Sequence, residues 1–146
     1  MDNALRELYQ EVILDHSRHP RHHGVLEDAS HKAEGYNPLC GDRVTVYLKL
    51  GEDNRVADIK FQGKGCAISQ ASASMMTEQV KGRPVADAAR LIAAFKAMMH
   101  DGGVPTDGLG DLEALRGVRK FPVRVKCATL SWITLELALE ELRAAS

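Results

Sequence analysis

The sequence has no long apolar run, few aromatic residues and no excess of charge of either sign. No stretch approaches the roughly 20 apolar residues that a helix needs to cross a bilayer, so we expect no membrane segment. Aromatic residues make up 5% of the chain, and 19 basic residues balance 20 acidic ones. This composition lacks the basic surface and the stacking platform of a nucleic-acid-binding protein. A basic segment followed by an apolar one, which would mark a secretory signal, is also missing at the start, so we expect a cytoplasmic protein.

The remaining composition is that of an ordinary soluble protein. The chain has 146 residues, of which 45% are hydrophobic and 27% charged. This length predicts one folded domain over residues 1–146, and the composition excludes a disordered or fibrous chain. Residues 16–24 hold four of the six histidines, and Pro20 and Gly24 interrupt any regular ligand spacing there. We interpret this segment as a solvated turn.

Hydrophobic periodicity predicts the secondary structure. Apolar residues at helical spacing indicate helices over residues 3–18, 84–99 and 128–144, and small residues that allow close packing indicate a helix over 67–80. Alternation indicates strands over 44–50 and 56–61. A hairpin alone is marginal, so a third strand is expected from 36–41 or from 123–125. Residues 122–126 are expected to be extended, 112–115 to form a helical turn, and 101–111 to form a loop. The resulting fold class is α+β, a small antiparallel sheet with helices packed on one face.

Three cysteines, Cys40, Cys66 and Cys127, lie where the predicted elements begin or end. An odd number of widely spaced cysteines argues against a disulfide framework and leaves buried, reactive or metal-binding thiols. Cys40 lies in a Pro/Gly turn before a strand. Cys66 and Cys127 are expected to precede helices, whose N-termini stabilise thiolates.

Asp42 follows Cys40 by two residues, so in an extended segment both side chains point to the same side. Three sulfur ligands and one oxygen ligand suit a tetrahedral Zn²⁺ ion. Taken alone, Asp42 would be interpreted as a turn residue that caps the start of the strand. Beside three thiols at element boundaries, we favour Asp42 as a metal ligand.

The residues around the cysteines resemble a known family. The segments 37–42 (NPLCGD), 63–69 (GKGCAIS) and 124–130 (RVKCATL) are similar to the three cysteine motifs of the IscU/NifU-like iron–sulfur cluster assembly proteins. The opening segment 8–16 (LYQEVILDH) is also similar to theirs. IscU-type scaffolds carry a histidine directly before the last cysteine, where this chain has Lys126, and their chain between the last two cysteines is shorter. Both features resemble the SufU branch.

This resemblance implies a fold of the IscU/NifU-N type and a zinc protein that takes sulfur from a SufS-type cysteine desulfurase. The zinc ligands implied are Cys40, Asp42, Cys66 and Cys127. Cys40 would accept the sulfur after a desulfurase histidine replaces it on zinc, and Arg124 would help to activate the desulfurase. Downstream proteins of the SUF assembly system are further implied partners.

Three functions follow as hypotheses. The first is a zinc-dependent sulfurtransferase, which we favour. The second is a scaffold on which the same thiols hold an iron–sulfur cluster, and the third is a structural zinc domain that only docks partners.

One further feature is a run of basic residues near the last cysteine, which is either a solvated surface or an electropositive rim for a partner. It consists of Arg116, Arg119, Lys120, Arg124 and Lys126.

Overall fold

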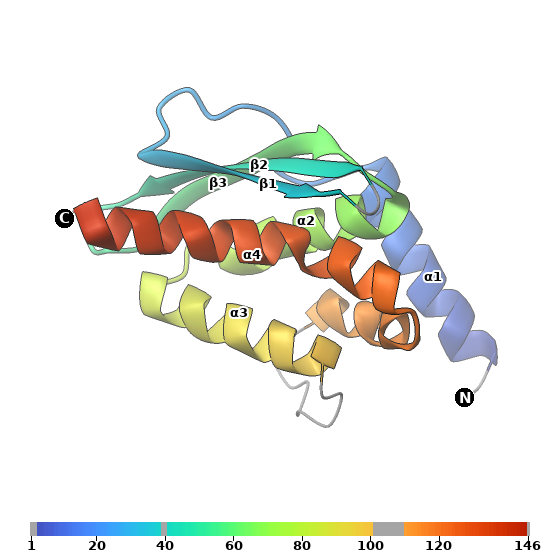
Figure 1. Cartoon of the computed structure of the whole chain (residues 1–146). Helices are drawn as coiled ribbons and strands as arrows, with labels where there is room; N and C mark the ends of the chain where they lie inside the picture. Colours follow the sequence, from blue (N-terminus) through green and yellow to red (C-terminus); the bar gives the residue numbers. More distant parts are fainter. Residues whose placement is uncertain (1–2, 39–40, 101–109, 146) are drawn as a thin grey trace.

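A computed structural model describes residues 3–38, 41–100 and 110–145 (Figure 1). The elements follow one another along the chain as α1 (Asn3–Arg18), β1 (His31–Asn37), β2 (Asp42–Leu50), β3 (Val56–Lys64), α2 (Ala67–Val80), α3 (Val85–His100), the 3₁₀ helix η1 (Gly110–Lys120) and α4 (Pro122–Ala145). The helices predicted over 3–18 and 67–80 are confirmed with the same bounds. The loop predicted over residues 101–111 falls largely outside the described residues.

The three strands form an antiparallel sheet in the order β1-β2-β3. The hairpin predicted from residues 44–61 is its β2–β3 part. Of the two segments proposed for the third strand, 36–41 overlaps the end of β1, whereas 123–125 is helical. Strand β1 escaped prediction because its inward positions are small or polar. Helix α4 passes so close to Gly35 that a Cβ there would lie 2.1 Å from Thr134 Oγ1.

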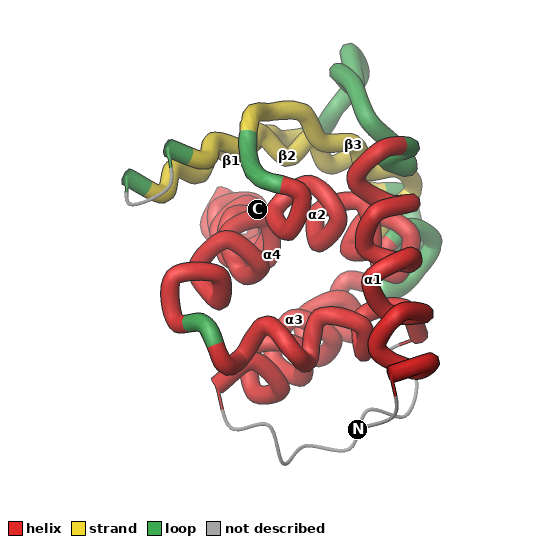
Figure 2. The backbone as a smooth tube through the Cα atoms, turned by 90° about the vertical axis from the view of Figure 1, so that its right-hand side faces the viewer, coloured by secondary structure: helices red, strands yellow, loops and turns green. Residues whose placement is uncertain are grey.

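Helices α2 and α4 contact the sheet, and α1, α3 and η1 pack around these two helices (Figure 2). The helices gather on one face of the sheet, which confirms the predicted α+β architecture.

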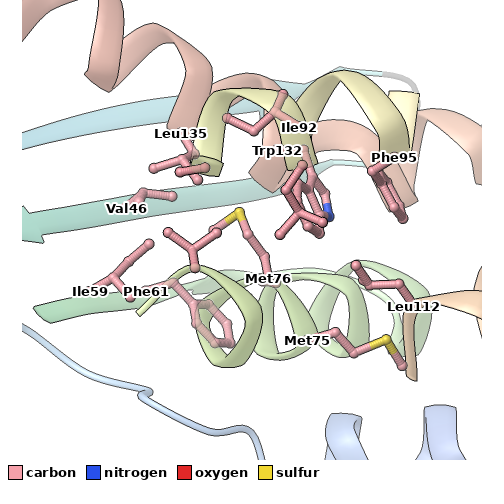
Figure 3. Close-up of a cluster of buried hydrophobic side chains, with 14 of the residues drawn as sticks. Val46, Ile59, Phe61, Met75, Met76, Ile92, Phe95, Leu112, Trp132 and Leu135 are labelled. Carbon is pink, nitrogen blue, oxygen red and sulfur yellow. The ribbon is translucent and has the colours of Figure 1, made fainter. Parts of the chain in front are cut away.

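The core lies between the sheet and the helices that cover it (Figure 3). Phe95 of α3 stacks on Trp132 of α4 with a ring-centroid distance of 4.4 Å. The Trp132 indole N–H donates a hydrogen bond of 3.0 Å to the buried Ser72 Oγ of α2, whose hydroxyl donates in turn to the Ala128 carbonyl. This pair of bonds links α2 to α4 inside the core.

The chain before and within α4 differs from the prediction. Residues 122–126, expected to be extended, form the first turns of α4, and the helical turn expected at 112–115 is part of the longer η1. Pro122 occupies the first helical position, where its missing N–H costs nothing, and the Val125 N–H already donates to the Phe121 carbonyl. The alternation of Val123 and Val125 with basic residues therefore does not mark a strand.

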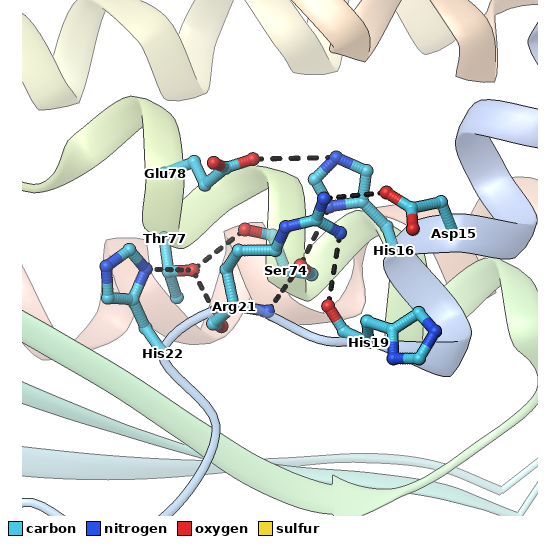
Figure 4. Close-up of polar contacts among 8 residues, drawn as sticks. All are labelled: Asp15, His16, His19, Arg21, His22, Ser74, Thr77 and Glu78. Carbon is cyan, nitrogen blue, oxygen red and sulfur yellow. Dashed lines mark hydrogen bonds and ion pairs between the residues drawn. The ribbon is translucent and has the colours of Figure 1, made fainter.

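The histidine-rich segment is partly buried, which corrects its interpretation as a solvated turn (Figure 4). His16 is 1% exposed, and its Nδ1 lies 2.8 Å from Ser74 Oγ. The Arg21 backbone N–H also donates to Ser74 Oγ, and His22 Nδ1 lies 3.1 Å from Thr77 Oγ1. These contacts fasten the loop after α1 to helix α2. Because Ser74 is fully buried, they serve packing rather than contact with a substrate.

The pKa of His22 is lowered mainly by burial and also by the nearby Lys81 cation, against the opposing carboxylates of Asp58 and Glu78. The unfolded chain therefore binds a proton more readily than the folded one. The free energy of unfolding should fall as the pH drops below about 6.5 and level off below the folded pKa. We expect His22→Asn to reduce the difference between the free energies of unfolding at pH 7.5 and pH 5.5, measured by urea denaturation. Asparagine is chosen because it tolerates the positive φ of 54° at this position. His19→Asn, an exposed position in the same loop, is the control, and equal pH slopes in both variants would contradict the assignment.

Candidate metal centre

Asp42 is the first residue of β2 and lies opposite Asn37 in the register with β1. Its side chain is 2% exposed, and its Oδ2 has no hydrogen-bond partner in the part of the chain that the structure describes. A buried carboxylate oxygen without a partner is costly, so such atoms generally bind a cation or a water molecule. Asp42 is thus more than a turn residue at the start of a strand.

Cys66 occupies the N-cap position of α2, as predicted. Its backbone is extended, with φ −72° and ψ 172°, and its carbonyl accepts hydrogen bonds from the Gln70 N–H and the Ser69 hydroxyl. The thiol makes no capping hydrogen bond. The sulfur therefore stays available at the positive end of the helix, where a thiolate is stabilised.

Cys127 lies within α4, so the prediction that it directly precedes a helix is wrong. The earlier start of α4 at Pro122 places Cys127 in the second helical turn, where its side chain is 1% exposed. Burial inside a packed helix fixes this sulfur more firmly than a position at a loop end.

The structure brings Asp42, Cys66 and Cys127 together, with one ligand atom from each lying within 4.8 Å of the other two. Two ligands of one zinc ion, each at ~2.0–2.3 Å from it, lie at most about 4.6 Å apart, so small adjustments would let one ion bind all three. In the described residues this is the one group of three or more histidine, cysteine or acidic side chains gathered closely enough to hold a metal ion. Cys40, predicted as the fourth ligand, lies outside the described residues.

The loop between β3 and α2 passes close over Asp42, and this approach depends on Gly65. A Cβ at Gly65 would lie 2.0 Å from Ser69 Oγ and 3.1 Å from Asp42 Oδ1. Only glycine fits such a gap without displacing its neighbours. Sequence reasoning did not assign a role to Gly65, although the glycine directly before Cys66 was a visible signal.

The donor set and its surroundings fit a divalent soft or borderline metal. Two cysteine sulfurs and one carboxylate suit Zn²⁺, which favours tetrahedral sites with sulfur ligands. The buried Asp42 Oδ2, which has no hydrogen-bond partner among the described residues, can serve as an oxygen ligand for such an ion.

Arg124, predicted to act on the partner, is exposed at the start of α4, three residues before Cys127. Residues three apart on a helix are neighbours, so Arg124 lies one turn before the cysteine that α4 contributes to the centre. The remaining members of the basic run are divided between η1 and α4. Arg119, Lys120 and Lys126 are exposed and Arg116 is half-buried.

The chain matches the family model described as NifU-like N terminal domain over residues 8–140. It belongs to the NifU-like N-terminal domain family. The zinc-dependent sulfurtransferase SufU of Bacillus subtilis (strain 168) is 49% identical to this NifU-like chain over 136 residues, which are 90% of this chain and 89% of that protein. The iron–sulfur cluster assembly scaffold protein IscU of Streptococcus pyogenes serotype M1 is 43% identical over 139 residues, which are 94% of this chain and 86% of that protein.

Solved structures show the same NifU-like fold. An iron–sulfur cluster assembly scaffold protein for the SUF system from Fervidobacterium islandicum AW-1 superposes with a TM-score of 0.85 and 40% identity, over 92% of this chain and 98% of that one. The N-terminal part of a NifU-like protein from Brucella abortus superposes with a TM-score of 0.87 and 25% identity, over 97% and 99% of the two chains. The predicted IscU/NifU-like fold is thereby confirmed. No helix among the described residues combines the length and the apolar character that crossing a membrane requires.

Removing the Asp42 carboxylate should weaken metal binding without unfolding the chain. Asp42→Ala leaves all three cysteines in place but deletes the one oxygen donor of the group. We expect its zinc affinity, measured by competition with a chromophoric chelator, to fall about tenfold or more. An unchanged affinity would show that Asp42 is only a turn residue.

A methyl group at Gly65 should disturb the centre without touching any ligand. Gly65→Ala forces Ser69 or Asp42 to move, so we expect a loss of zinc affinity of about tenfold and an altered visible spectrum with bound Co²⁺. Gly51→Ala is the matched control, since its new Cβ would meet ordinary van der Waals contact at 3.6 Å from Ala57. Equal affinities of the two variants would refute the role of Gly65.

Proposed function

We propose that this NifU-like protein is a zinc-dependent sulfurtransferase that accepts persulfide sulfur from a cysteine desulfurase of the SufS type, for iron–sulfur cluster assembly. The observation that carries the proposal is the convergence of Asp42, Cys66 and Cys127, with a carboxylate oxygen left for a cation. The 49% identity to a zinc-dependent sulfurtransferase supports it.

Each residue of the centre has a distinct part in the proposal. Asp42, Cys66, Cys127 and Cys40 hold the ion, and bound zinc keeps cysteine thiols deprotonated at neutral pH. Cys66 and Cys127 anchor the centre to α2 and α4. Cys40, which lies between Pro38 and Gly41 in the sequence, is the residue proposed to react.

The sulfur transfer is a thiol exchange on the partner's persulfide. The Cys40 thiolate attacks the outer sulfur of that persulfide, a new sulfur–sulfur bond forms on Cys40, and the partner cysteine leaves as a thiolate. No oxidant or reductant is needed, because one sulfur–sulfur bond replaces another. Arg124, an exposed cation three residues before Cys127, is proposed to bind the partner and promote this step.

The partner and the location belong to the same proposal. A cysteine desulfurase supplies a persulfide, and a reducing compartment such as the cytoplasm keeps the three cysteines as thiols. Proteins of the SUF assembly system are proposed as downstream recipients. The residues 1–146 are proposed to act as a single domain.

A scaffold that holds a nascent cluster is the second candidate. The 43% identity to a protein named as an IscU scaffold favours it. Lys126 argues against it, because it stands where scaffolds of the IscU type carry a histidine, and an ammonium group is a poor metal ligand. A scaffold would be brown and would pass its cluster to an apo-protein, whereas a zinc sulfurtransferase is colourless.

Single cysteine substitutions separate sulfur acceptance from metal binding. We expect Cys40→Ser to abolish stimulation of the desulfurase while zinc is retained by Asp42, Cys66 and Cys127. Cys66→Ser, which removes an anchor, should lose zinc and stimulation together. The measurements are zinc content, desulfurase turnover, and mass spectrometry of the persulfide after incubation with desulfurase and cysteine. Persulfide on Cys127 with Cys40 unmodified would overturn the assignment and favour the scaffold.

A further inference from the structure

A large cavity is lined by residues next in sequence to Cys66 and near Cys127, and apart from Arg124 its lining residues have no part in the proposed sulfur transfer. It has a volume of about 1010 Å³, is partly open to solvent, and is lined by parts of α1, η1, the first turn of α2 and the start of α4. Its surface is mostly apolar and includes the side chains of Ile13, Ile68, Val118 and Phe121. Figure 1 shows η1, in light orange, next to the first turns of α4, and η1 also contacts α1 and α2.

All charged side chains among the described residues that line this cavity are cationic. Arg116, Arg119, Lys120 and Arg124 line it. No carboxylate in the described ranges forms an ion pair with Arg119, Lys120 or Arg124. Arg119, Lys120 and Arg124 are therefore open to an external anion.

Two helix N-termini add to the positive potential. Ala67, the first residue of α2, and Phe121, directly before α4, both line the cavity. The N-terminus of a helix carries a partial positive charge, and apolar walls strengthen its field. The same end of the molecule thus combines apolar walls, side-chain cations and two helix ends.

We propose that this cavity is a binding site for a small organic anion, a molecule with an apolar body and a carboxylate or phosphate group. Pockets for such molecules measure about 300–1,000 Å³ and have mainly apolar walls with a few polar groups, as here. The apolar body lies against Ile13, Ile68 and Phe121, and the anionic group pairs with Arg119 and Lys120. A single pocket of this volume, lined by residues of four elements, favours a small molecule over an extended acidic peptide of a partner protein.

The position of the site relates it to the metal centre without depending on the proposed function. Ala67 and Ile68 directly follow Cys66, and Arg124 precedes Cys127 by one helical turn. A bound anion therefore lies against the residues that directly follow Cys66 and close to Arg124. Binding can be measured directly, so its outcome is separate from that of the sulfur-transfer experiment.

Octanoate and octan-1-ol test the proposal, because they share an apolar chain and differ in charge. Both are titrated into the zinc-loaded full chain and followed by backbone amide shifts in NMR spectra. We expect octanoate to shift the amides of Ile68, Gly117 and Arg119, with a Kd about fivefold lower than that of octan-1-ol. Arg119→Gln combined with Lys120→Gln should remove this preference and leave octan-1-ol binding unchanged. Lys32→Gln combined with Lys60→Gln, two cations of the sheet, is the matched control.

The apolar wall is tested separately. Phe121 is 60% exposed, so Phe121→Ser should weaken the binding of both probes with little effect on folding. Equal affinities for octanoate and octan-1-ol, or shifts confined to other parts of the chain, would overturn the proposal. Binding of an acetylated Glu-Leu-Glu-Leu-Glu peptide at this site, with none by octanoate, would also overturn it and assign the surface to a protein partner.

Discussion

Helices α2 and α4 are held together inside the core by Ser72, and the candidate metal centre depends on this link. The Ser72 hydroxyl donates to the Ala128 carbonyl and accepts from the Trp132 indole, so it fixes the backbone of α4 directly after Cys127. Cys66 at the start of α2 is thereby set in relation to Cys127 on α4. The sheet beneath both helices supplies Asp42, and the three side chains meet where strand and helices converge.

Burial at this meeting point decides the chemistry. Asp42 and Cys127 are almost completely withdrawn from solvent, whereas Cys66 is half-buried at a helix end. Buried anionic donors repel one another unless a cation lies between them, so the arrangement favours a bound metal over three separate ionised groups. The cations of the basic run lie outside this group, at the start of α4 and along η1, where they can meet a partner or a ligand.

Most of the fold could be predicted from the sequence because its periodicity is strong. Helix α1 and the hairpin of β2 and β3 have apolar residues at regular spacing, and the packing of the core agrees with that pattern. Helix α2 was predictable from its small residues, which allow close packing. Strand β1 could not be predicted, because its inward residues Ala33, Gly35 and Asn37 carry no hydrophobic signal. The start of α4 was missed because Val123 and Val125 alternate with basic residues, and tertiary contacts favoured the helix begun by Pro122.

The candidate site was predictable in part for similar reasons. The two-residue spacing of Cys40 and Asp42 and the glycines before Cys66 are local signals. The approach of Cys127 to Asp42 is set by long-range packing, which a pattern of residues does not contain. The need for glycine at position 65 was not predictable either, because it depends on long-range packing. The atoms that exclude a side chain there come from Ser69 in α2 and from Asp42 in β2.

The close contact of Gly35 with Thr134 lets α4 approach the edge strand β1 directly. Thr134 is seven residues from Cys127, about 10 Å along the same helix. A side chain at position 35 would meet the Thr134 hydroxyl, so that either this side chain rotates or α4 moves away from the strand. The absence of a single methyl group on an edge strand thus lets the helix that bears Cys127 lie directly against the sheet that bears Asp42.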